Sequence, residues 1–105
     1  MKREAQSKGN LFIDLSSTAL YTLKVVLLLP EDKSFLLEDL NRIIKDNGYF
    51  YPSKPSLYKG MNELIFYNII ERDISFRPYS YKLIQEKNVI IDRLKDDLIR
   101  FFDET

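Results

Sequence analysis

The stretch that decides the fold is SKPSLYKGMNELIFYNIIERD, Ser53 to Asp73, because its hydrophobic pattern changes halfway. As far as Ile65 the apolar residues recur at helical spacing and leave a polar face, which predicts an amphipathic helix. After Asn68 the chain is rich in isoleucine and then charged, a composition that favours a short strand. The stretch therefore predicts a helix that leads directly into a strand, with Asn68 as a left-handed exit from the helix.

Two further helices are predicted before this stretch. The hydroxyl residues at 16–18 offer N-caps for a first helix that ends at Pro30. A second helix follows Ser34, which is the expected cap, and Gly48 supplies a left-handed stop after it. In both helices the apolar residues share one face, so we expect that face to be buried.

Two strands and a last helix are predicted after the opening stretch. The strands span roughly 69–75 and 79–83, and Arg77 lies at the basic tip between them. The C-terminal segment has an apolar stripe that needs a partner surface. The stripe consists of Ile91, Leu94, Leu98, Phe101 and Phe102. It could form a homodimer contact, pack on the protein's own core, or bind another protein, and its width and terminal position favour the homodimer.

The order helix, helix, turn, helix, strand, turn, strand, helix predicts a mainly α fold with a small β-hairpin, in the α+β class. It is also the order of a winged helix-turn-helix domain with an additional C-terminal helix. We expect residues 1–10 to form a flexible basic tail, residues 11–84 to form the winged-helix DNA-binding domain, and residues 85–105 to form the C-terminal dimerisation helix.

The composition argues against several classes of function. The 105 residues include no cysteine and no histidine, which excludes disulfides, thiolate catalysis, Ser-His triads and zinc sites built from those residues. The three glycines are isolated, so no phosphate-binding loop can be assembled. A site made of carboxylates alone stays open, although no acidic pair stands out. We expect that the protein is not an enzyme and that it holds no cofactor and no metal. We also expect it to be cytoplasmic, without a membrane span or a secretory signal.

The charge is balanced overall but unevenly distributed. The formal net charge is zero, a mild argument against a nucleic-acid partner. Basic residues outnumber acidic ones in segments 1–10 and 53–82, whereas acidic residues predominate in segments 31–46 and 86–105. The positive surplus therefore lies on the tail and on the segment that contains the third helix and the hairpin.

The motifs resemble those of known families. The run YPSKPSLYKGMNELIFYNIIERD followed by YSYKL resembles the recognition helix and wing of winged-helix proteins. PadR-like transcriptional regulators share the Ser-x-x-Ser-Leu-Tyr entry at 53–58, the Tyr-x-Leu strand at 81–83 and a dimerising C-terminal helix. The segments NELIFYNII and FIDLSSTALYTLKVVLLL resemble winged-helix replication initiators of plasmids and phages at least as well as the chain resembles PadR-like regulators. The resemblance covers roughly residues 11–83 and implies a homodimer that binds double-stranded DNA, either a transcriptional regulator or a replication initiator.

A winged helix would present the polar face of its third helix and its wing to DNA. The candidate DNA-binding residues are Lys54, Ser56, Tyr58, Lys59, Asn62, Arg77 and Lys82. We expect Lys54 and Lys59 to neutralise phosphates, and Asn62 to make a bidentate contact with adenine. Tyr58 would hydrogen-bond a phosphate or pack on a thymine methyl, and Arg77 has the reach for a narrow minor groove.

Each of these residues also has a simpler explanation. Lysines and asparagines on a polar helix face are commonly only solvated, and Tyr58 could cover the edge of the core. The aromatic residues at 49–51, together with Tyr79 and Tyr81, could stack on single-stranded bases, but such residues are more often core. The main rival function is that of a winged helix that binds proteins instead of DNA. A DNA-binding protein should carry a continuous positive strip made of Lys54, Lys59, Arg77 and Lys82. A protein-binding one should carry an apolar patch there instead.

Overall fold

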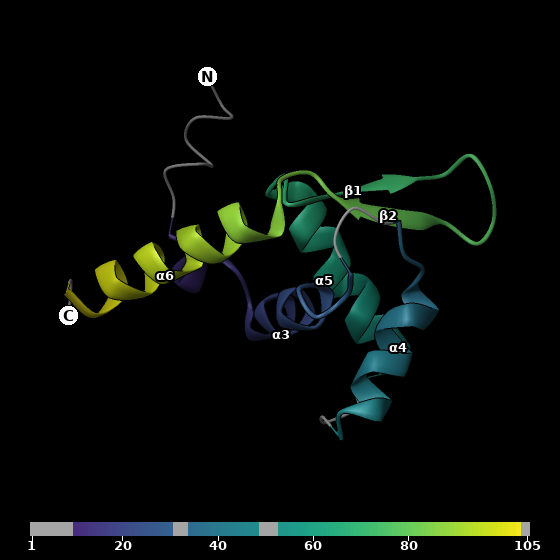
Figure 1. Cartoon of the computed structure of the whole chain (residues 1–105), viewed down its shortest axis with the longest axis horizontal. Coiled ribbons are helices and arrows are strands. Elements are labelled where there is room, and N and C mark those ends of the chain that lie inside the picture. Colours follow the sequence, from purple (N-terminus) through teal and green to yellow (C-terminus); the bar gives the residue numbers. More distant parts are fainter. Residues whose placement is uncertain (1–9, 31–33, 49–52, 104–105) are drawn as a thin grey trace.

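Helices dominate the structure, a computed structural model that describes residues 10–30, 34–48 and 53–103. Within these residues a two-stranded antiparallel hairpin lies between the last two helices (Figure 1). The predicted mainly α class with a small β-hairpin is confirmed. The elements are α2 (Leu11–Asp14), α3 (Ser17–Val26), α4 (Leu37–Asp46), α5 (Lys54–Phe66), β1 (Ile70–Asp73), β2 (Ser80–Leu83) and α6 (Lys87–Asp103).

Serine caps begin α3 and α5, and the one at Ser16 lies among the hydroxyl residues that the sequence offers as caps. The Ser16 hydroxyl accepts a hydrogen bond from the Ala19 amide (3.1 Å) at the start of α3. The Ser53 hydroxyl accepts one from the Ser56 amide (3.3 Å) at the start of α5, which also has a proline in its first turn. Both caps satisfy amides that have no partner inside the helix.

The helix α4 begins later than the sequence predicts, because the N-cap is Leu36 and not Ser34. The Phe35 amide donates to the Tyr81 carbonyl and the Tyr81 amide to the Phe35 carbonyl, both at 2.8 Å. This antiparallel bridge keeps the chain extended at Phe35, so the helix can start only after it. The Asp39 carboxylate then accepts a hydrogen bond from the Leu36 amide (2.8 Å), which supplies one half of a capping box.

Two residues with left-handed backbone conformation end helices at the predicted positions. Gly48 follows α4 with a φ of 67°, and Asn68 follows α5 with a φ of 62°. Glycine and asparagine are the residues that adopt this conformation at least cost. At Asn68 the chain turns from α5 into β1, so the helix and the hairpin are joined by only a few residues.

The hairpin is shorter than the predicted strands 69–75 and 79–83. The first strand ends at Asp73, because the Ser75 amide donates to Asp73 Oδ1 (2.9 Å) and begins a turn. The register pairs Ile70 with Leu83, Glu71 with Lys82, Arg72 with Tyr81 and Asp73 with Ser80. Alternate pairs face opposite sides of the hairpin, and the side that carries Arg72 faces α5.

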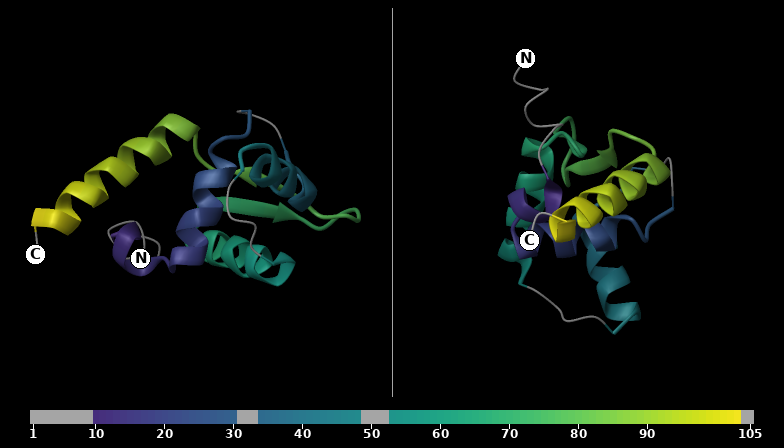
Figure 2. Two further views of the ribbon diagram at one scale, coloured as in Figure 1. Left: turned by 90° about the horizontal axis from the view of Figure 1, so that it is seen from below. Right: turned by 90° about the vertical axis from the view of Figure 1, so that its left-hand side faces the viewer.

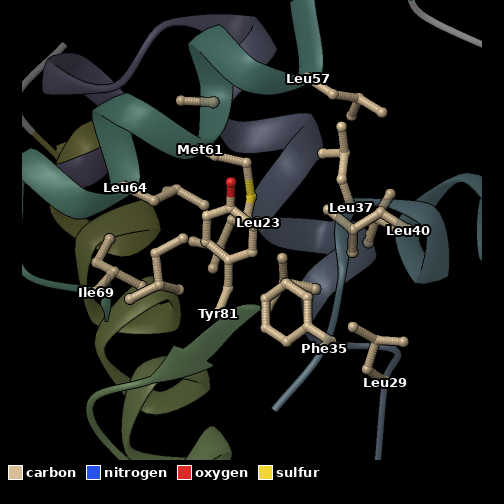
Figure 3. Packing of buried hydrophobic residues seen from close by; sticks show 14 of the residues in the cluster. Leu23, Leu29, Phe35, Leu37, Leu40, Leu57, Met61, Leu64, Ile69 and Tyr81 are labelled. Atoms are coloured by element: carbon tan, nitrogen blue, oxygen red, sulfur yellow. The ribbon is translucent and has the colours of Figure 1, made fainter. Parts of the chain in front are cut away.

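The core lies where α3, α4, α5 and the hairpin meet (Figure 3). All four contribute buried side chains, including Leu23, Leu40, Leu64 and Tyr81. Met61 of α5 is also fully buried, which confirms the face of that helix that the sequence assigns to the core. The opposite face of α5 is exposed to solvent.

The last helix, α6, extends toward the end of the molecule opposite the hairpin (Figures 1 and 2). Its beginning packs on the core through Ile90, which is buried, and Leu94. Farther along, Asp97 is buried and meets α2, a short helix that the sequence did not predict. Asp97 Oδ2 accepts a hydrogen bond from the Leu11 amide (3.0 Å), and the Asp97 carbonyl accepts one from Asn10 Nδ2 (2.9 Å).

Candidate nucleic-acid interface

The side of α5 that faces away from the core is open to solvent. The residues predicted to bind DNA from this helix are Lys54, Ser56, Tyr58, Lys59 and Asn62. All except Ser56 are exposed, and Tyr58 keeps 43% of its surface open. Ser56 is half-buried, and its hydroxyl lies 3.0 Å from that of Ser53, so it belongs to the helix cap.

The beginning of α5 borders a depression that it shares with α4 and the hairpin. Lys54 and Tyr58 line this depression from α5, Pro78 and Tyr79 line it from the hairpin, and Glu38 lines it from α4. The three elements therefore present one connected surface. Its charge is mixed, because both Glu38 and Lys54 line the depression.

Arg72 of β1 connects the hairpin to the exposed face of α5. Its Nη2 atom donates to Asn62 Oδ1 at 2.6 Å. Its guanidinium carbon also lies 5.4 Å from the ring centroid of Tyr81 and 6.0 Å from that of Tyr79, within the range of cation–π contacts. The Nε atom is buried without a hydrogen-bond partner among residues 10–30, 34–48 and 53–103. The guanidinium is thus held by one hydrogen bond and two aromatic rings.

Arg72 is not among the residues predicted from the sequence, because the side on which a strand residue lies depends on which face of the hairpin is buried. One signal was available. Arg72 follows Ile70 by two positions, and residues two apart in a strand share a face. Assigning Ile70 to the core would therefore have placed Arg72 on the side of α5.

Arg77 is exposed near the tip of the hairpin, as predicted, and its guanidinium carbon lies 5.2 Å from the centroid of the Tyr79 ring. The tip also exposes two large apolar side chains, Ile74 at 67% and Phe76 at 80%. Cationic and apolar groups therefore share the tip. The positive group is suited to phosphate, whereas the apolar groups are suited to base steps or to a protein surface.

Two acidic side chains near this surface take part in local structure. Glu63 of α5 accepts hydrogen bonds from the Ser16 amide (3.1 Å) and the Ser16 hydroxyl (2.6 Å), which places a negative charge at the N-terminus of α3. At the hairpin turn, the backbone amide and the hydroxyl of Ser75 lower the pKa of Asp73 below its usual value. Asp73 therefore stays ionised at neutral pH and reduces the positive charge of the hairpin.

Lys82 does not join the lysines of α5. It is paired across the strands with Glu71, on the side of the hairpin opposite Arg72. There it borders a second depression together with Leu29, which follows α3, and Lys87 at the start of α6. The strip expected from the sequence is therefore interrupted, with Lys54, Lys59 and Arg77 near α5 and the tip, and Lys82 behind the hairpin.

The aromatic residues that could stack on single-stranded bases do not share one environment in the structure. Residues 49–51 lie outside the described part of the chain. Tyr79 is half-buried beneath arginine side chains. Tyr81 is only 2% exposed and stacks on Phe35 with ring centroids 5.8 Å apart, so it is a core residue. Tyr81 is therefore not available to stack on a base.

The residues of the apolar stripe of α6 differ in how far they are buried. Ile91, Leu94 and Phe101 are half-buried, and Leu94 packs on the core. Leu98 and Phe102 are exposed, at 39% and 65% of their surface. The beginning of the helix thus folds back on the protein's own core, one of the alternatives that the sequence left open. The members of the stripe that stay exposed, Leu98 and Phe102, lie toward its C-terminal end.

No match to the chain was found among protein-family models, curated proteins or solved structures. Within the described residues, no group of three or more acidic side chains is placed to hold a metal ion. The helices of that part of the chain all fall short of the length and apolar character needed to cross a membrane. The function must therefore be inferred from the surface formed by α5 and the hairpin.

Proposed function

We propose that this protein is a winged helix-turn-helix protein that binds double-stranded DNA as a homodimer and regulates transcription. In this proposal α5 is the recognition helix and the hairpin is the wing. The element order supports it, as does the bridge between Phe35 and Tyr81, which adds a third extended segment beside the hairpin. A replication initiator of a plasmid or phage would use the same surface for a different purpose.

The observation that carries the proposal is that the exposed face of α5 and the hairpin border one connected surface. The major groove admits an α-helix, and a hairpin beside that helix reaches the adjacent backbone or minor groove. Lys54 and Lys59 would then neutralise phosphates next to the helix, and Arg77 would do so at the hairpin tip. These contacts fix the orientation of the protein on DNA but carry no sequence information by themselves.

The proposed homodimer would form through the exposed apolar residues of α6. Leu98 and Phe102 lie toward the end of the molecule opposite the hairpin, so a contact there leaves α5 and the hairpin free. A two-fold symmetric contact would set two recognition helices in related positions on a palindromic site. Half-sites separated by about one DNA turn are the expected target.

The test is fluorescence anisotropy of a labelled random duplex, titrated with the protein at several salt concentrations, together with the mass of the protein in solution. Counterion release predicts binding that weakens steeply as salt rises. Binding of this kind by a dimer supports the proposal. Absence of binding at low salt contradicts it.

One observation favours a second candidate, a protein-interaction module. Ile74 and Phe76 expose apolar surface at the hairpin tip, and the chain has no net positive charge. Apolar side chains on an exposed edge are typical of surfaces that bind another protein. Failure to bind duplex DNA at low salt would make this candidate the leading one.

A further inference from the structure

The orientation of the Asn62 side-chain amide follows from its contact with Arg72. A guanidinium group donates hydrogen bonds and accepts none, so the Asn62 atom 2.6 Å from Arg72 Nη2 must be the oxygen. The Asn62 amino group, Nδ2, is therefore directed away from Arg72. Asn62 is exposed, so this amino group is accessible to a ligand on the outer face of α5.

The Asn62 amino group and the Arg72 guanidinium group are both hydrogen-bond donors. Asn62 offers Nδ2, and Arg72 places a positive charge directly behind it. A base edge that presents acceptors matches such a surface, and guanine presents two of them, N7 and O6, in the major groove. Adenine presents one acceptor and the N6 amino donor, so a bidentate contact requires the second lone pair of the asparagine oxygen to face the base.

We propose that Arg72 is a positioning residue that determines which base Asn62 recognises. With its oxygen directed toward Arg72, Asn62 presents Nδ2 on the outer face of α5 and donates from it to the acceptor edge of guanine. It does not make the bidentate adenine contact expected from the sequence alone. The inference rests on the proposed function, because it assumes that α5 enters the major groove of DNA.

The experiment begins with selection of preferred duplexes from a random library by the wild-type protein. Asn62→Ala then identifies the base pair that Asn62 reads, because discrimination is lost at that pair. Arg72→Met frees the Asn62 oxygen and keeps an apolar side chain against the two tyrosine rings. At the pair identified by Asn62→Ala, the preference for guanine over adenine should fall by about tenfold or more, and move toward adenine.

Arg77→Met is the matched control, since Arg77 packs on the same Tyr79 ring from the tip of the hairpin. It should weaken binding to all sequences alike and leave the base preference unchanged. If Arg72→Met fails to fold, Asn62→Asp replaces it, because a carboxylate still accepts from Arg72 but has no amino group to donate. That variant should lose the guanine preference at the same pair.

The possible outcomes separate the two proposals. A wild-type preference for adenine at this pair overturns the inference. So does an unchanged guanine preference in Arg72→Met, or in Asn62→Asp where that variant replaces it. In these cases the proposed function survives, because DNA is still bound. Absence of duplex binding by the wild-type protein at low salt overturns the proposed function and the inference with it.

Discussion

Asp97 is buried, although its position in the sequence suggests a solvent-exposed residue. It lies in a helix rich in charged residues, yet its side chain is only 2% exposed. The carboxylate is tolerated there because it accepts a hydrogen bond from the Leu11 amide and lies beside the guanidinium groups of Arg93 and Arg100. The Leu11 amide belongs to the first turn of α2, where no intrahelical acceptor is available.

Replacing Asp97 with alanine should therefore destabilise the protein. The substitution leaves the Leu11 amide without its acceptor and removes the ion pairs of Asp97 with Arg93 and Arg100, so the free energy of unfolding should fall by about 3 kcal/mol. Urea denaturation measures this change. Asp96→Ala, at the exposed neighbouring position, should change the free energy of unfolding by less than about 0.5 kcal/mol. Equal effects of the two substitutions would contradict the role assigned to Asp97.

Gly60 marks the closest approach between α3 and α5. A Cβ atom added at Gly60 would collide with Thr22 Oγ1 and lie 3.2 Å from the Thr18 carbonyl oxygen. Thr22 cannot easily move, because it is fully buried and its hydroxyl donates to that carbonyl (2.8 Å). The glycine is thus required by packing.

Gly60→Ala should lower the melting temperature, although alanine is the better helix former. The gain in helix propensity is about 1 kcal/mol, whereas overpacking typically costs about 1–3 kcal/mol and here involves a backbone carbonyl as well. Thermal unfolding followed by circular dichroism measures the result. Adding Thr22→Ala to Gly60→Ala removes the nearest atom and should recover part of the loss. A more stable Gly60→Ala variant would show that the two helices can separate freely.

At the scale of the elements, the starts of α3 and α5 are fixed by serine caps of unequal strength. Among the described residues, Ser53 forms its side-chain hydrogen bonds within its own helix turn, with Ser56. Ser16 accepts from the Ala19 amide and also donates its hydroxyl to the Glu63 carboxylate, so it connects α3 to α5. Hydrogen bonds to a charged acceptor are stronger than neutral ones.

Ser16→Ala should therefore be more damaging than Ser53→Ala. Loss of an ordinary cap costs about 1 kcal/mol, which is the change expected for Ser53→Ala. Ser16→Ala should cost about 2 kcal/mol, because the charge-assisted bond to Glu63 is lost as well. Guanidinium chloride denaturation of both variants tests the order, and an equal loss would mean that the Glu63 contact does not contribute.

At the scale of the whole molecule, the two surfaces with proposed functions lie apart. The hairpin and the exposed face of α5 occupy one part, and the C-terminal part of α6, which carries the exposed Leu98 and Phe102, extends toward the opposite end (Figure 1). A change in one surface is therefore expected to leave the other intact. This separation allows DNA binding and dimerisation to be tested independently.

Replacing Lys59 and Arg77 together with alanine should weaken duplex binding and flatten its dependence on salt. Each lost phosphate contact lowers the slope of log K against log salt by about one. Both side chains are exposed, so the thermal unfolding temperature should change little. Anisotropy titrations at several salt concentrations provide the measurement. Lys95→Ala on α6 is the control, and a slope that is equally steep in the double variant would argue against the assigned surface.

Changing Leu98 and Phe102 together to lysine should convert the proposed dimer into a monomer. Each substitution places a charge in an apolar contact, where it has no partner. Light scattering gives the mass of each variant. Val89→Lys alters an exposed residue on another side of the same helix and should leave the mass unchanged. A dimer that persists in the double variant would place the interface elsewhere.

Most elements could be predicted because their signals are local. The Ser16 and Ser53 caps, the left-handed Gly48 and Asn68 and the change of period in the opening stretch each depend on a few neighbouring residues. The candidate surface was predicted in part. The exposed residues of α5 follow from helical spacing alone, whereas Lys82 and Arg72 required knowledge of which side of the hairpin is buried.

Local patterns in the sequence are sufficient to predict the order of the longer helices and the hairpin, the Ser16 cap, the left-handed Gly48 and Asn68 and the buried face of α5. The tertiary structure alone decided the burial of Asp97, the late start of α4, the separation of Lys82 from the lysines of α5 and the contact between Arg72 and Asn62. The physical reason is the range of the interactions. Caps and hydrophobic periods act within a few residues, whereas the partner of Asp97 lies 86 positions away in the chain.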